Sequence, residues 1–299
     1  MTNITDERPA RKTCVALGFF DGLHRGHQAV IGEVFADDAL APAVFTFASR
    51  DAGFKAGAEL LLSGELKAAR LSAMGVEYLY SPDFEELRGM SAADFVRDIL
   101  VGRLNAARCV CGYDFRFGRG AAADAADLAA LCRPFGIAVT VVPPFCSEGQ
   151  VVSSTAIRAL IKDGAIERAN ALLGYPYLFA HEVIHGNARG RTINTPTINQ
   201  LLPPSLVVPK FGVYATATEV DGRTYKSVTN IGVRPTVGDL TVPLAETHII
   251  GFDGDLYGRT IPVSLHAFLR GEVRYASFDE MAQQIRRDLA HVKAMRFAY

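Results

Sequence analysis

Hydrophobic periodicity changes halfway along this chain, and this change constrains the fold more than any other feature. In the first half, short apolar runs alternate with longer amphipathic stretches. The apolar runs span residues 13–19, 43–47, 77–80, 108–111 and 137–142, and the amphipathic ones span 27–35, 65–74, 92–100 and 123–132. Because buried strands alternating with helices form βαβ units, this half is predicted to be an α/β domain with a parallel sheet.

The second half instead contains closely spaced strand-like segments. They span residues 212–220, 224–231, 246–252 and 260–269 and are rich in Thr, Val, Ile and Tyr. Asp221-Gly222 supplies a hairpin turn between the first two of them. Such a pattern predicts a small antiparallel β-barrel.

Three helices are expected outside these two patterns. Residues 153–162 and 166–173 follow the parallel sheet. Residues 278–296 lie near the end of the 299-residue chain, with apolar side chains recurring on one helical face. Gly174-Tyr175-Pro176 interrupts the helical pattern. We therefore expect two domains, residues 12–175 and 176–299.

Composition limits the classes of function. The 299 residues are 49% hydrophobic and 21% charged, with a net charge of −1. This balance is typical of a globular protein and argues against bulk electrostatic binding to nucleic acid or to an anionic membrane. No apolar run is long enough to cross a bilayer, and residues 1–12 lack the features of a secretion signal.

Cysteine usage points to a reducing compartment. The five cysteines are odd in number, and their surroundings are apolar: Cys14, Cys109, Cys111, Cys132 and Cys146. We interpret all five as reduced core thiols and expect a cytoplasmic location.

The run Val15–His27 carries the strongest candidate site. A strand ends in a glycine-rich turn, and a helix is expected to start near Gly26, so His24 and His27 face a helix N-terminus. Such a terminus attracts phosphate, and imidazole N–H groups can donate hydrogen bonds to phosphate oxygens. Gly18, Phe20 and Gly26 are the expected nucleotide-binding positions beside them. The alternative is two surface histidines on a tight turn; a metal site is disfavoured because no third ligand follows nearby.

A second run, Val152–Arg158, supports phosphate binding. It places the hydroxyls of Ser154 and Thr155 at a helix start and the guanidinium of Arg158 one turn later. The alternative is an ordinary helix cap with a solvated arginine.

The run Gly112–Gly118 follows a predicted strand and contains Asp114, Phe115 and Phe117. Its position at the carboxyl end of a parallel strand suits a ligand-facing loop. An aromatic packing turn is about equally plausible from this run alone.

Taken in order, these runs resemble the bacterial bifunctional riboflavin kinase/FAD synthetase family. The order is G-F-F-D-G-x-H-x-G-H, then G-x-D-F-x-F-G, then S-S-T-x-I-R. The second half continues the resemblance at 185–191, 196–199, 212–214, 230–236, 246–248, 256–258 and 269–288. The resemblance implies a Rossmann-like FMN adenylyltransferase domain followed by a riboflavin kinase barrel with a C-terminal helix.

The resemblance also implies residue roles. The barrel would transfer the γ-phosphate of ATP to riboflavin, and the first domain would join FMN to the AMP part of ATP. ATP phosphates would be held by His24, His27, Ser154, Thr155 and Arg158, with Asp114 and its aromatic neighbours near the flavin. In the barrel, Thr197 and Asn199 would hold Mg²⁺ and ATP phosphates, and Glu246 would act as base. These residue types suit such roles, since Mg²⁺ prefers hard oxygen ligands and a carboxylate can accept a hydroxyl proton. A capping turn at Pro196–Asn199 and an exposed Glu246 at a strand start are the ordinary alternatives.

Three segments and one single position depart from the family pattern. The departures are Ala48-Ser-Arg50 for a Pro-His-Pro-like segment, Gly120–Asp124 for a segment with another Arg and Gly, Asn194-Thr195 for Gly-Phe, and Tyr175 for Arg. They indicate a divergent member. Three other hypotheses are a one-site enzyme, a non-catalytic regulator that binds flavin or nucleotide, and another nucleotidyltransferase fused to an unrelated barrel. The expected partners are the small molecules ATP, riboflavin and FMN.

Overall fold

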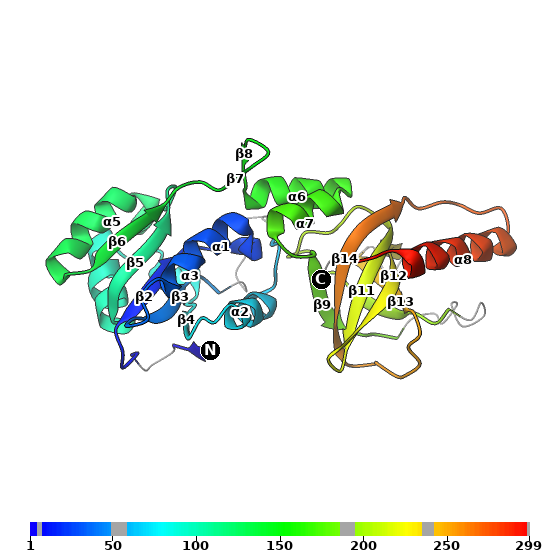
Figure 1. The fold of residues 1–299 in the computed structure, drawn as a ribbon, viewed down its shortest axis with the longest axis horizontal. Helices are drawn as coiled ribbons and strands as arrows, with labels where there is room; N and C mark the ends of the chain where they lie inside the picture. The colour runs from blue at the N-terminus through cyan, green and yellow to red at the C-terminus, as the bar shows by residue number, and fades with distance from the viewer. Residues whose placement is uncertain (5–7, 49–58, 186–194, 235–241, 298–299) are drawn as a thin grey trace. The chain divides into compact units, whose positions relative to one another are not determined.

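The computed structural model describes residues 1–4, 8–48, 59–185, 195–234 and 242–297. Its internal contacts divide the chain into two compact units, Met1–Ser154 and Thr155–Tyr299. Helices α6 (Ser154–Asp163) and α7 (Ile166–Leu173) lie between this division and the expected domain boundary near Tyr175, which stays a prediction. Each unit is described below by itself (Figure 1).

The first unit is built on a six-stranded sheet. Its strands are β1 (Thr2–Asn3), β2 (Thr13–Leu17), β3 (Ala41–Phe45), β4 (Tyr78–Tyr80), β5 (Ala106–Gly112) and β6 (Ala138–Val142). They lie in the order β1-β4-β3-β2-β5-β6, and all neighbours are parallel. Chain order therefore reverses between β2 and β5, which is where ligands bind in open sheets of this kind. The predicted parallel sheet is confirmed.

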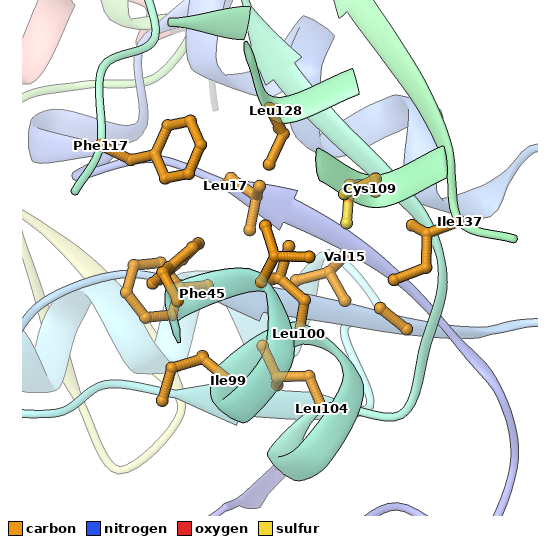
Figure 2. Packing of buried hydrophobic residues seen from close by; sticks show 14 of the residues in the cluster. Val15, Leu17, Phe45, Ile99, Leu100, Leu104, Cys109, Phe117, Leu128 and Ile137 are labelled. Carbon is orange, nitrogen blue, oxygen red and sulfur yellow. The ribbon is translucent and has the colours of Figure 1, made fainter. Parts of the chain in front are cut away.

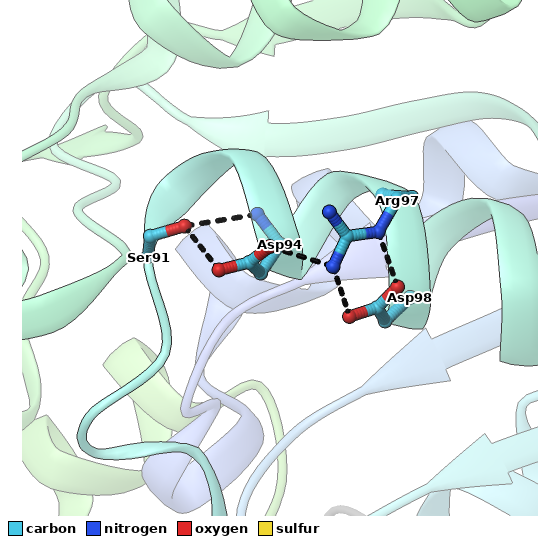
Figure 3. A network of polar contacts seen from close by, with 4 residues as sticks. All are labelled: Ser91, Asp94, Arg97 and Asp98. Carbon is cyan, nitrogen blue, oxygen red and sulfur yellow. Dashed lines mark hydrogen bonds and ion pairs between the residues drawn. The ribbon is translucent and has the colours of Figure 1, made fainter.

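Helices and helical turns connect these strands as the periodicity predicts. They are α1 (Arg25–Gly32), α2 (Gly64–Ala73), α3 (Phe84–Leu87), α4 (Ala92–Asp94) and α5 (Ala125–Cys132). Helix α4 runs directly into a π-helical stretch, Phe95–Arg103, so the helix predicted over 92–100 continues to Arg103. Ser91 caps α4 by accepting the Asp94 N–H, and Arg97 bridges the carboxylates of Asp94 and Asp98 on the surface (Figure 3).

The core of this unit is packed from both strands and helices. β2 is buried along its whole length, as expected for a strand covered on both faces. Figure 2 shows Val15 of β2 beside Leu100 of the π-helical stretch and Leu104, the residue that follows it, with Leu17 of β2 and Cys109 of β5 in the same cluster. This packing fixes the carboxyl end of β2, from which the candidate site begins.

The second unit contains a six-stranded antiparallel barrel. Its strands are β9 (Leu178–Glu182), β10 (Ile198–Leu201), β11 (Gly212–Val220), β12 (Arg223–Arg234), β13 (Val242–Ile249) and β14 (Thr260–Arg270). Their order is β10-β13-β12-β11-β14-β9. An isolated bridge between Ile184 and Asn199 brings the two edges together, because the Ile184 N–H donates to the Asn199 carbonyl at 2.8 Å. The predicted barrel is confirmed, and it is nearly closed.

The predicted hairpin and C-terminal helix are also present. Asp221 and Gly222 both have positive φ, 51° and 74°, at the tight turn joining β11 to β12. Helix α8 (Phe278–Ala294) packs on the barrel through Val292 against Ala215 and Ala267. Figure 1 shows this helix in red beside the yellow strands.

Several elements escaped the sequence patterns. Strands β1, β9 and β10 were not expected, and neither was the small hairpin formed by β7 (Cys146–Ser147) and β8 (Gln150–Val151). β13 begins at Val242 rather than 246, because Pro243 is accommodated inside the strand. Glu246 is therefore in mid-strand and half-buried, not at an exposed strand start.

The cysteine interpretation needs one correction. All five cysteines are free thiols, and four are buried, but Cys146 is exposed because it lies on the small β7–β8 hairpin rather than in the core.

In the described part of the chain, no helix is both long and apolar enough to cross a membrane.

Candidate functional site

The first candidate site lies where three strands of the parallel sheet end together. Leu17 of β2 is in register with Phe45 of β3 on one side and Cys111 of β5 on the other. The turn after β2, the segment after β3 and the Gly112–Gly118 loop therefore start side by side. The structure thus brings the predicted nucleotide turn next to the predicted flavin loop.

The turn after β2 has an unusual backbone. Phe20 and Leu23 have φ values of 52° and 41°, although neither is glycine, and Gly22 has φ 77°. A non-glycine residue in the left-handed region costs about 1 kcal/mol or more. Both side chains are buried, at 3% and 1% exposure, so their packing stabilises this conformation. A side chain at Gly22 would also meet Leu61 Cδ1 at 2.6 Å. The turn is held in one shape by its surroundings.

Asp21 anchors the same turn from inside. Asp21 is 4% exposed, and its carboxylate accepts the Leu61 N–H at 2.9 Å. Its carbonyl accepts the Ser154 hydroxyl at 3.0 Å. This bond ties the predicted Ser-Ser-Thr motif to the turn after β2 within the first unit. Residues 18–27, which form this turn and carry His24 and His27, are called the histidine turn below.

His24 and His27 lie together at the N-terminus of α1. His24 is the N-cap residue, and its Nδ1 accepts the His27 N–H at 3.3 Å. The two rings are stacked, with centroids 3.5 Å apart and planes at 20°. The Phe20 ring meets His27 edge-on at 5.4 Å. Gly26 completes this arrangement, because a Cβ there would approach the His24 ring to 3.2 Å. The predicted pairing of the histidines is therefore present in the fold.

Both imidazoles are neutral at physiological pH. Burial lowers the pKa of His24 from 6.5 to about 4. Burial also lowers the pKa of His27 well below its usual value, and electrostatic interaction with His24 and with the positive charge of Lys67 lowers it further. Since His24 Nδ1 accepts a hydrogen bond, the proton of this ring is assigned to Nε2. His27 Nδ1 is buried and has no hydrogen-bond partner among the described residues. Such an atom is suited to a ligand.

The Gly112–Gly118 loop is divided between surface and core. Asp114 is exposed, and Phe115 is half-buried with its ring stacked on Phe117, centroids 5.6 Å apart. Phe117 is only 7% exposed and belongs to the hydrophobic core. Of the predicted flavin-binding residues, Asp114 and Phe115 are accessible, and Phe117 supports Phe115 from below.

Thr155 and Arg158 belong to the second unit. Thr155 is the second residue of α6, and Arg158 lies about one turn further along the helix. Their placement near the histidines stays a prediction. Several quoted motif positions lie outside the described residues: Ser49, Arg50, 186–191, Asn194, Pro235 and Thr236.

The barrel carries the second candidate site as a row of aligned residues. Asn199 of β10 pairs with Glu246 of β13, which pairs with Asn230 of β12. Asn230 is in turn opposite Val213 of β11, which is opposite Arg270 of β14. Because paired residues of neighbouring strands point to the same side of a sheet, the row places two amides beside the carboxylate of Glu246. Asn230 begins one of the runs that carry the resemblance, but its position beside Glu246 was not predicted.

Asn199 and the adjoining segment are fixed by several bonds. The Asn199 backbone is paired with Glu246 on one side and Ile184 on the other. His248 Nδ1 lies 2.8 Å from the Pro196 carbonyl, so β13 also holds the residue preceding Thr197. Asn199 is 5% exposed, and its Oδ1 has no hydrogen-bond partner among the described residues. An oxygen with this geometry is a candidate cation ligand.

Comparisons with known proteins agree with both units. A family model described as FAD synthetase matches residues 6–156, and one described as riboflavin kinase matches residues 173–296. The chain is 35% identical to a bifunctional riboflavin kinase/FMN adenylyltransferase from Bacillus subtilis, covering 93% of this chain and 90% of the relative. It is 36% identical to the protein of that name from Escherichia coli K12, covering 94% and 92%.

A solved structure shares the whole architecture. The crystal structure of a protein named macrolide-efflux protein, from Streptococcus pneumoniae, is 31% identical and has a TM-score of 0.86. The match covers 97% of each chain.

Proposed function

The chain belongs to the family of bifunctional riboflavin kinase/FMN adenylyltransferases, and from that premise we propose that each unit carries one of two successive reactions. The barrel transfers the γ-phosphate of ATP to riboflavin and produces FMN. The first unit transfers the adenylyl group of a second ATP to FMN and produces FAD and pyrophosphate. The stacked His24–His27 pair at the N-terminus of α1 is the observation that carries this assignment for the first unit.

In the first unit, the chain's own groups position the triphosphate. A phosphate oxygen of FMN attacks the α-phosphorus of ATP, and the bond to pyrophosphate breaks. Negative charge develops on the pyrophosphate, and fixed donors stabilise it. His24 Nε2–H, the ring of His27 and the N-terminal N–H groups of α1 are these donors. Because both rings are neutral, each has one ring N–H that can be donated to a phosphate oxygen.

Other residues of the motifs complete the binding site in this proposal. Gly18, Phe20 and Gly26 line the nucleotide, and Ser154, Thr155 and Arg158 contact its phosphates. Asp114 and Phe115 contact the flavin, with Phe117 behind them. Ser154 supports this arrangement, since its hydroxyl already bonds the Asp21 carbonyl in the histidine turn.

In the barrel, Glu246 accepts the proton of the ribityl 5′-hydroxyl as that oxygen bonds to the γ-phosphorus. This assignment is supported by its half-buried, mid-strand position between Asn199 and Asn230. A positioned carboxylate base contributes about 10²–10⁴-fold to such a step.

Thr197 and Asn199 are the proposed Mg²⁺ ligands. The buried and unpartnered Oδ1 of Asn199 fits a hard cation. Among the described residues, no cluster of three or more His, Cys, Asp or Glu side chains is suited to a metal, so phosphates and water would complete the coordination. When bound, Mg²⁺ neutralises charge on the ATP phosphates. The cytoplasmic location expected from the cysteines stays a prediction.

Product analysis tests the proposal. The purified chain is incubated with riboflavin, ATP and Mg²⁺, and separately with FMN, ATP and Mg²⁺, and the flavins are separated by chromatography. We expect FMN and then FAD from riboflavin, and FAD with pyrophosphate from FMN. Formation of FMN but no FAD would indicate that only the barrel is active. Formation of FAD from supplied FMN, with no FMN formed from riboflavin, would indicate that only the first unit is active. Tight flavin binding without turnover would instead indicate a regulator.

A further inference from the structure

Lys67 is a buried lysine that none of the motifs contains. It lies on α2 and is 4% exposed. Its ammonium group donates to the Phe19 carbonyl at 3.2 Å, to Thr46 Oγ1 at 3.1 Å and to the Phe47 carbonyl at 3.2 Å. These acceptors follow β2 and β3, so Lys67 joins the two strand ends that border the histidine turn.

The hydrogen bonds of Lys67 fit the charged form. An ammonium group has three protons, and the three neutral acceptors use all of them. The Nζ atom also lies 4.9 Å from the centroid of the Phe19 ring, where a cation is attracted to the aromatic face. Burial lowers the pKa of Lys67 to about 8, and the nearby negative charge of Asp21 opposes this shift. The group therefore carries its charge at pH 7 inside the protein.

Lys67 is connected to the histidine pair through one peptide. Phe19, whose carbonyl it binds, directly precedes Phe20, and the Phe20 ring contacts His27. The same carbonyl accepts the Thr46 hydroxyl at 2.7 Å. The charge of Lys67 also reaches His27, since it contributes to the lowered pKa of that ring. Lys67 is thus linked to the histidine pair through the Phe19–Phe20 peptide and through its charge.

We propose that Lys67 is a positioning residue for adenylyl transfer: its buried positive charge draws the polyphosphate of ATP onto the turn that holds His24 and His27. This inference rests on the proposed adenylyl transfer in the first unit. The two histidines are neutral and cannot supply charge, so a fixed cation behind them strengthens phosphate binding. A buried charge is also screened less by salt than one on the surface.

The alternative role for Lys67 is a mechanical one, in which its hydrogen bonds only join the strand ends. Thr46→Val separates the two roles, because it removes one acceptor and the Thr46–Phe19 bond but keeps the charge. Lys67→Met removes the charge with little change in side-chain length. Lys67→Arg keeps the charge.

The test measures KM for ATP and kcat in FAD formation from FMN at pH 7. We expect Lys67→Met to raise KM for ATP about ten-fold with a much smaller change in kcat, since one poorly screened unit charge is lost. Lys67→Arg should restore KM, and Thr46→Val should leave it near the wild-type value. An unchanged KM in Lys67→Met, or an equal rise in Thr46→Val, would overturn the inference.

A pH profile covers the case in which Lys67→Met does not fold. Wild-type KM for ATP should rise as pH increases from 7 to 9.5, whereas that of Lys67→Arg should rise less, because arginine stays protonated. Among the described residues, Asp21 and His27 are the titratable groups that interact electrostatically with Lys67, and burial keeps the pKa of His27 well below this range. Parallel profiles would contradict the inference. Absence of FAD from the wild type would count against the proposed function instead.

Discussion

The two candidate sites are built in different ways. In the first unit, the site lies beyond the ends of β2, β3 and β5, on a turn whose conformation depends on buried Phe20 and Leu23. In the barrel, Asn199, Glu246 and Asn230 lie within strands, and ladder register alone aligns them. The first site depends on loop packing and on desolvated imidazoles, and the second depends on strand pairing.

This difference implies that the two sites should fail independently. A change to the histidine turn should leave the strand register of the barrel intact. A change to Asn199, Glu246 or Asn230 should leave the histidine turn intact. The predictions below test this separation, from the largest expected effect to the smallest.

Glu246→Gln should abolish most riboflavin phosphorylation. The amide keeps the shape of the side chain but cannot accept the hydroxyl proton, so kcat for FMN formation should fall by about 10³-fold. FAD formation from supplied FMN should stay within about two-fold of the wild type. A comparable loss of both activities would show that the sites are not separate.

His27→Ala should produce the opposite pattern. Removing this donor should lower FAD formation from FMN by about 10²–10³-fold, as expected for the loss of a preorganised donor to developing charge. FMN formation from riboflavin should be unaffected. Gln28→Ala is a matched control on the same helix, since its side chain bonds the Leu23 carbonyl rather than lying in the imidazole stack.

Asp288→Ala should destabilise the barrel unit selectively. Asp288 is 7% exposed, and its Oδ2 accepts Arg270 Nε at 3.0 Å and Nη2 at 2.8 Å. Loss of this carboxylate leaves a half-buried guanidinium unpaired and should lower the free energy of unfolding by about 3 kcal/mol. Urea denaturation with FMN formation as the probe measures this. Gln284→Ala, which removes one bond to the other carboxylate oxygen, should cost only about 1 kcal/mol.

His24→Asn should reduce the acid sensitivity of the first unit. The folded-state pKa of His24 is about 4 against 6.5 when exposed, so the neutral ring contributes stability above pH 6.5 that is lost as pH falls towards 4. Between pH 7.5 and 5 this contribution is about 2 kcal/mol. Asparagine does not titrate and can still cap α1. Urea denaturation of both proteins at the two pH values, followed by far-UV circular dichroism, should show a smaller loss in the variant; equal losses would contradict the account.

The sequence predicted much of the first site because its signals are local. A strand, a glycine-rich turn and two histidines adjoin in the chain, and the structure stacks the two rings. Lys67 could not be found in this way. Its three acceptors come from segments distant in sequence, and a lysine in an amphipathic helix normally faces solvent.

The barrel was harder to predict in detail. Because proline disfavours a strand, Pro243 prevented the start of β13 from being predicted. The short strands β9 and β10 lack a clear alternation of apolar and polar residues. Register is set by long-range pairing, so the alignment of Asn230 with Glu246 emerges only from the folded barrel. The resemblance supplied Glu246 and Asn199 as candidates, and the ladder explains why they are neighbours.

Complementation in trans tests the central claim, one reaction in each unit, most directly. His27→Ala and Glu246→Gln proteins are each incubated with riboflavin, ATP and Mg²⁺, alone and as a mixture, and FAD is quantified. Neither variant alone should form appreciable FAD, but the mixture should, because the first protein releases FMN and the second adenylylates it. A mixture that forms no FAD, although the wild type does, would contradict the account.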